Sequence, residues 1–193
     1  MSKKEDILNR FRSNVHERFD MPALDDIAAV TYPDPLAQFV RMSEAVGGRV
    51  IEPGPGEDLN MLVRSLFPDA REIATNLPEF TTATRNPDTA AGAQALNGTD
   101  VGIIRGEFGV AENGCIWVPQ TMKERAVCFI SEHLVILLPK DSIVNNMHEA
   151  YRQVSFNGYG YGTFVSGPSK TADIAQVLVM GAQASRSVTI ILV

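Results

Sequence analysis

The chain has 193 residues, of which 45% are apolar and 21% are charged, and its formal net charge is −6. This composition is close to that of average soluble proteins, so it predicts one folded domain with a sizeable core and excludes wholesale disorder. The acidic balance argues against a nucleic-acid-binding protein or a protein of anionic membrane surfaces, because both need basic side chains facing phosphates. Small molecules and other proteins remain as expected partners.

Metal and membrane signals are weak. The two cysteines, Cys115 and Cys128, lack the spacing of a zinc or iron–sulfur site, and the three histidines are widely scattered. We therefore expect no metal and no cofactor in this chain. The longest nearly apolar stretch, residues 133–139, is far shorter than the ~20 residues of a membrane span. The charged beginning does not resemble a secretory signal, which favours a cytoplasmic protein.

The first residues predict a helical arm. Apolar side chains recur at helical spacing from Ile7 to Phe19, with charged residues between them, as in an amphipathic helix. Residues 20–32 have the composition of a linker. We therefore expect an N-terminal helical arm, residues 1–30, followed by an α/β domain formed by residues 31–193.

The next segment predicts alternating helices and strands. Asp34 and Pro35 suit the start of a helix that ends at Gly47-Gly48. A short strand is expected at 49–52, and apolar spacing over 59–67 predicts a third helix. This order is typical of β–α units.

The middle of the chain predicts strands in quick succession. Residues 77–99 have weak periodicity and read as a long irregular stretch. Further along, strands are expected at 101–104, 115–118, 126–130, 134–138, 163–165 and 188–193, and helices at 143–151 and about 171–180. Helices alternating with apolar strands favour an α/β fold with a three-layer sheet. The clustered middle strands predict antiparallel hairpins inserted into a mainly parallel sheet or added at its edge.

The first candidate ligand-binding motif follows the expected strand at 163–165. It reads Ser166-Gly167-Pro168-Ser169-Lys170-Thr171-Ala172-Asp173. At the start of a helix, this stretch would present free backbone N–H groups, hydroxyls and the Lys170 ammonium to an anion. The alternative is structural, since Ser169 or Thr171 would cap the helix and Asp173 would repel an anion.

The second motif is the turn Gly109-Val110-Ala111-Glu112-Asn113-Gly114. Asn-Gly is a favoured hairpin turn, which by itself explains the motif. The functional alternative is that Glu112 acts as a nucleophile or base while Asn113 donates a hydrogen bond to the same ligand.

These stretches resemble the LUD family, and within it the lactate-utilisation protein C (YkgG-like) group. The resemblance also rests on Arg125, on His133 before an apolar strand, and on the terminal Ile190-Ile191-Leu192-Val193. It covers roughly the second half of the chain well and the rest by architecture. One departure is visible: Ala182-Gln183-Ala184-Ser185 stands where the group commonly has Val-His-Gly-Pro, so a histidine present in relatives is absent here.

The resemblance implies a Rossmann-like sheet similar to the NagB/RpiA/CoA-transferase superfamily. It also implies an accessory or substrate-binding subunit of an iron–sulfur complex that oxidises L-lactate to pyruvate. The clusters would belong to partner proteins, the iron–sulfur lactate-utilisation proteins A and B, and a homo-oligomer is also compatible. A small carboxylate such as lactate would bind at Asn113, Gly114, Arg125, His133, Ser166, Gly167, Pro168, Ser169, Lys170, Thr171 and Asp173.

Two other functions stay open at this point. Ala111-Glu112-Asn113-Gly114 is similar to the Ser-Glu-Asn-Gly element of class I CoA-transferases, in which the Glu attacks an acyl-CoA; Glu112 would then be the catalytic nucleophile. A ligand-sensing or scaffolding module without catalysis is the third interpretation. His133 has a structural alternative as well, a hydrogen bond at a strand edge.

Overall fold

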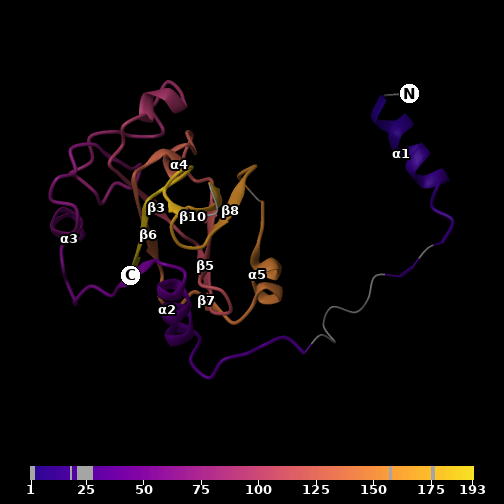
Figure 1. The fold of residues 1–193 in the computed structure, drawn as a ribbon, viewed down its shortest axis with the longest axis horizontal. Helices are drawn as coiled ribbons and strands as arrows, with labels where there is room; N and C mark the ends of the chain where they lie inside the picture. The colour runs from indigo at the N-terminus through magenta and orange to yellow at the C-terminus, as the bar shows by residue number, and fades with distance from the viewer. Residues whose placement is uncertain (1–2, 18, 21–27, 157, 175–176) are drawn as a thin grey trace.

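Figure 1 presents a computed structural model, which describes residues 3–17, 19–20, 28–156, 158–174 and 177–193, without the side chains of residues 172–178. Its centre is a five-stranded sheet with the order β1-β11-β6-β3-β2, in which all neighbours are parallel. The strands are β1 (Arg49–Ile51), β2 (Ile73–Ala74), β3 (Val101–Arg105), β6 (His133–Leu138) and β11 (Ser187–Leu192).

The apolar runs of the central strands form two separate clusters because successive side chains point to opposite faces. Leu134, Ile136 and Leu138 of β6 enter one cluster, whereas Val135 and Leu137 enter the other. The second cluster is covered by α3 (Leu59–Leu66), which buries Val63 there and begins at an Asp58 cap. One face of the central sheet therefore packs against a helix, as expected.

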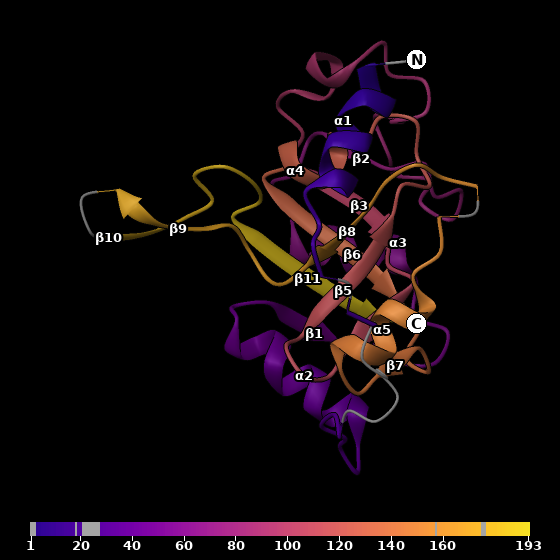
Figure 2. The same cartoon turned by 90° about the vertical axis from the view of Figure 1, so that its right-hand side faces the viewer.

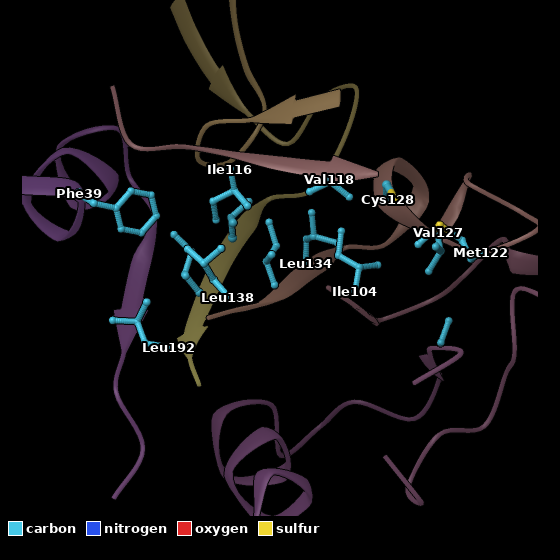
Figure 3. Close-up of a cluster of buried hydrophobic side chains, with 14 of the residues drawn as sticks. Phe39, Ile104, Ile116, Val118, Met122, Val127, Cys128, Leu134, Leu138 and Leu192 are labelled. Atoms are coloured by element: carbon cyan, nitrogen blue, oxygen red, sulfur yellow. The ribbon is translucent and has the colours of Figure 1, made fainter. Parts of the chain in front are cut away.

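The opposite face packs largely against a second sheet, with the order β7-β4-β5-β8. Its strands are β4 (Phe108–Val110), β5 (Cys115–Pro119), β7 (Ile143–Val144) and β8 (Gly162–Val165). Figure 3 shows Ile116 and Val118 of β5 in the cluster with Leu134 and Leu138 of the central sheet. The expected antiparallel strands therefore form a covering layer of their own rather than an edge of the central sheet.

Helices complete this packing. In α2 (Pro35–Ala45), Asp34 caps the first turn by accepting from Ala37 N at 3.0 Å, as predicted, and Phe39 is fully buried in the cluster that both sheets share. The short α4 (Val127–Ile130) closes the same cluster. α5 (Met147–Gln153) covers the outer face of the second sheet, where Trp117 and Ala150 are buried. The fold is mixed α/β with a parallel central sheet, which confirms the predicted class.

Three element predictions are wrong. Residues 127–130 form a helical turn rather than a strand, and residues 143–144 form a strand ahead of α5 rather than its first turn. The predicted helix at 171–180 is a two-stranded hairpin of β9 (Lys170–Ile174) and β10 (Val177–Met180), which stands out from the domain in Figure 2.

The irregular stretch contains only one short helical segment among its described residues, the 3-10 turn η2 (Ala93–Leu96). α1 (Lys3–Ser13) lies away from both sheets in Figure 1, and none of its residues is buried. The division into arm and domain stays a prediction. Among the helices in the described ranges, none is long and apolar enough to cross a membrane.

Candidate functional site

The loop between β8 and β9 carries the first motif, and it is fixed against the end of α2. Gly167 has a φ of +66°, and a Cβ atom at this position would lie 2.6 Å from the carbonyl oxygen of Val46. Only glycine tolerates both this conformation and this close approach. Pro168 is buried beside Gly47, so the loop runs directly over the last residues of the helix.

The other side of the loop is hydrogen-bonded to the segment that precedes β11. Ser169 N donates to Ser185 O at 3.0 Å, and Gly181 N donates to Ser169 O at 2.9 Å. The Ser185 hydroxyl, which is buried, donates to Ser131 O at 2.9 Å. The end of α2 and the segment before β11 thus hold the motif in one conformation.

This loop forms one wall of a cavity with a volume of ≈ 340 Å³. We name it the β8–β9 pocket, lined by Cys128, Phe129, Leu134, Thr163, Phe164, Val165, Ser166, Gly167, Pro168, Ser169, Lys170, Ala184, Ser185 and Val188. None of these lining residues is acidic. Hydroxyl groups and one ammonium group therefore set its polar character, which suits a small anion.

The prediction that this motif begins a helix, and so offers a helix N-terminus to an anion, is nevertheless wrong. Because Lys170 pairs with Met180 and Thr171 with Val179 in a hairpin, no helix begins here and no free helical N–H groups face the pocket. The Lys170 ammonium donates to Val46 O at the end of α2, where the helix dipole favours a cation. The backbone of Asp173 lies in β9, and its side chain is outside the described residues.

The second motif forms a four-residue turn between β4 and β5. Gly114 N donates to Val110 O at 2.9 Å, and Cys115 N donates to the Asn113 side chain at 3.1 Å. The exposed Glu112 carboxylate accepts from Met147 N at 2.9 Å, at the start of α5. Glu112 therefore serves the N-terminus of that helix, where a negative charge is stabilising.

The two motifs touch at one point. The Ser166 hydroxyl donates to Asn113 O at 3.2 Å, which places the end of the turn against the beginning of the β8–β9 loop. Glu112, Asn113 and Gly114 are outside the lining of the β8–β9 pocket, so the structure brings the motifs into contact without joining their side chains in one cavity.

Arg125 and His133 lie elsewhere. The Arg125 guanidinium stacks 4.5 Å from the centre of the Tyr161 ring. His133 Nδ1 is 2.7 Å from Ser187 Oγ, and its ring packs on Phe67. The hydrogen bond agrees with the structural alternative, but β6 lies between β11 and β3 and is not at an edge of the sheet. His133 faces a different cavity of ≈ 410 Å³ at the amino ends of the central strands.

Sequence reasoning missed part of the pocket wall. Ala184 and Ser185 line the β8–β9 pocket, and they belong to the Ala182-Gln183-Ala184-Ser185 stretch that departs from the group pattern. That departure from the group pattern was the one sequence signal that could have pointed to these two pocket residues. Cys128 also lines the pocket; burial raises the pKa of its thiol to about 12, so it is a neutral wall residue at physiological pH.

The chain is similar to two curated proteins, each named "Lactate utilization protein C". It is 30% identical over 102 residues to that of Shouchella clausii, covering 50% of this chain and 44% of the relative. It is 30% identical over 101 residues to that of Oceanobacillus iheyensis, covering 49% and 43%. The matched segment thus spans less than half the length of these relatives.

A solved structure supports the fold. The crystal structure of a DUF162 family protein from Deinococcus radiodurans superposes with a TM-score of 0.64, covering 85% of this chain and 99% of that one at 15% identity. At this identity the likeness concerns the fold alone. The family model of the LUD domain matches residues 36–193, which contain both sheets and the β8–β9 pocket. The chain therefore belongs to the LUD-domain family.

Proposed function

We propose that this chain acts in lactate utilisation, as an accessory or substrate-binding subunit of an iron–sulfur complex that oxidises L-lactate to pyruvate. The observation that carries the proposal is its 30% identity to two proteins named for lactate utilisation. The work of the subunit would be to bind the organic acid and to stabilise the assembly.

The chemistry of the cysteines supports this division of labour. The chain has two cysteines, whereas an iron–sulfur cluster is usually held by four thiolates. Cys115 lies in β5 and Cys128 in α4, and burial raises the pKa of each thiol to about 12, which disfavours the thiolate that binds iron. The two electrons removed from lactate would pass to clusters in partner proteins, the lactate-utilisation proteins A and B.

The β8–β9 pocket is the proposed site for the carboxylate. The Ser169 hydroxyl can donate a hydrogen bond there, and the exposed Lys170 ammonium retains two further N–H donors beside its bond to Val46 O. The Ser166 hydroxyl gives its proton to Asn113 O, so it lines the pocket as an acceptor. Among the lining residues that the structure describes, Lys170 is the one charged side chain, and it would attract a carboxylate.

Growth on L-lactate tests the role. We expect deletion of the gene to abolish growth on L-lactate while the genes for two cysteine-rich partners stay intact. Complementation with the Ser169→Ala variant should restore growth less well than complementation with the Ser65→Ala variant. Ser65 is the control because it is exposed on α3 and its hydroxyl donates to Leu62 O of the same helix. Unchanged growth of the deletion strain would contradict the proposal, and co-purification with the partners would support it.

The first alternative function is that of a non-catalytic scaffolding module, which needs no ligand in the β8–β9 pocket. In a reconstituted complex, Lys170→Ala and Glu112→Gln variants that retain full lactate oxidation would favour it. The CoA-transferase interpretation needs a free Glu112 carboxylate, and the bond from Met147 N competes with that role.

A further inference from the structure

A separate cavity lies where the chain leaves the central strands. It has a volume of ≈ 330 Å³ and is lined mainly by Arg105, Glu107, Pro119, Thr121, Pro139 and Tyr159. Arg105 is the last residue of β3, and Pro139 follows the last residue of β6. In open α/β sheets, ligands bind outside the carboxyl ends of the strands. We name this cavity the β3–β6 cavity; its lining differs from that of the β8–β9 pocket.

The polar residues of the β3–β6 cavity stand on a rigid corner. A Cβ atom on Gly106 would lie 2.4 Å from Ile116 Cγ2, so this residue faces the core, and its neighbours Arg105 and Glu107 line the cavity. The N–H groups of the corner are paired, Gly106 N with Leu137 O at 2.8 Å and Glu107 N with Trp117 O at 2.9 Å. The side chains, rather than the backbone, are left to bind a ligand.

The charges of the cavity are of both signs. Arg105 forms an ion pair with Glu79, yet its side chain remains 43% exposed. The Glu107 carboxylate is exposed, and no residue in the described part of the chain donates a hydrogen bond to it. The Tyr159 hydroxyl accepts from Trp117 Nε1 at 3.4 Å and keeps its own proton to donate. Pro119, Pro139 and the Tyr159 ring supply an apolar wall.

We propose that the β3–β6 cavity binds a small organic acid that has a hydroxyl or amino group next to its carboxylate and an apolar side chain. The carboxylate pairs with Arg105, the neighbouring hydroxyl or amino group donates to Glu107, and the side chain packs on the two prolines. Lactate belongs to this chemical class, but the β3–β6 cavity is a second site with a lining different from that of the β8–β9 pocket, so either proposal can fail without the other.

The fluorescence of the single tryptophan can report ligand binding, because Trp117 is hydrogen-bonded to Tyr159 in the wall of the cavity. We would titrate the full chain with leucic acid, L-leucine and isocaproic acid, which share a carbon skeleton, and follow both Trp117 fluorescence and the heat of binding. Saturable binding of leucic acid or leucine, at least about tenfold tighter than that of isocaproic acid, is expected. Comparing the first two identifies which donor the cavity prefers.

Variants assign the binding to the named side chains. Glu107→Gln and Arg105→Gln should each weaken binding about tenfold or more, whereas Glu44→Gln, an exposed acid on α2, should leave it unchanged. Thermal unfolding checks that each variant is folded. Absence of saturable binding by both measurements, equal affinity for isocaproic acid, or unchanged affinity in both cavity variants would overturn the proposal.

Discussion

Single glycines determine how closely the loops of the candidate site approach α2. Gly114 has a φ of +67°, and a Cβ atom there would lie 2.6 Å from Ser43 N. Gly167 approaches Val46 in the same way from the other motif. Both motifs therefore contain a glycine that packing requires, whatever ligand their side chains bind.

Replacing Gly114 with alanine should destabilise the domain strongly. The left-handed conformation costs about 1 kcal/mol and the displaced helix backbone about 1–3 kcal/mol more, so the free energy of unfolding should fall by about 2–4 kcal/mol. Gly98→Ala is the matched control, because its φ is +75° and nothing lies within 4 Å of the added Cβ. Urea denaturation measures both, and equal losses would refute the packing argument.

Glu112 should contribute to stability through α5. Removing its carboxylate in Glu112→Ala leaves Met147 N without its acceptor and should cost about 1 kcal/mol in unfolding free energy. Glu112→Gln keeps an acceptor oxygen and should cost less. Urea denaturation compares the two variants. In parallel, mass spectrometry after incubation with an acyl-CoA tests the nucleophile hypothesis, and a covalent adduct on Glu112 would contradict a purely structural role.

At the scale of elements, α1 shows that an amphipathic pattern specifies a helix but not what covers it. Ile7 and Phe11 of its apolar stripe are 57% and 71% exposed. A lone helix of this length is marginally stable in water, so its stripe contributes little to the stability of the domain.

Removal of the arm should therefore leave the domain intact. A chain beginning at residue 28 keeps the bonds from Asn146 Nδ2 to Val30 O and from Tyr32 N to Asn145 Oδ1, both 2.8 Å. We expect its thermal unfolding to match that of the full chain. A chain beginning at residue 34 loses both bonds and should be less stable by about 1–3 kcal/mol. A large loss of stability in the chain that begins at residue 28 would contradict this view of the arm.

Across the whole molecule, the two thiols lie in different core clusters, Cys128 between the sheets and Cys115 under α5. Burial raises the pKa of each from 9.0 to about 12. A raised folded-state pKa gives stability that is complete below the unfolded value and is lost as the pH rises toward the folded value.

The free energy of unfolding should thus decline between pH 9.0 and about 12, because only the unfolded chain releases thiol protons there. Urea denaturation at several pH values in this window measures the slope. The double variant Cys115→Ala, Cys128→Ala is the control, since lysines and tyrosines titrate in both proteins. Equal slopes in the two would show that the thiols do not contribute.

Caps, prolines and runs of apolar residues predicted several elements correctly because each acts on the backbone conformation of residues next to it in the sequence. Asp34 and Pro35 start α2, and the apolar run before the C-terminus forms β11, buried on both faces. The helix prediction for residues 171–180 was wrong because the spacing of apolar residues there suits either a helix or a strand. β-Branched residues favour the strand, and this segment has four of them: Thr171, Ile174, Val177 and Val179.

The sequence by itself determined the α/β class, most strands of the parallel sheet and the family resemblance, since these depend on composition, periodicity and contiguous motifs. Only the tertiary structure decided which side chains share a cavity. The contact of Ser166 with Asn113 and the pairing of Ser169 with Ser185 join residues far apart along the chain. Such contacts follow from the packing of two sheets and α2, which no local pattern encodes.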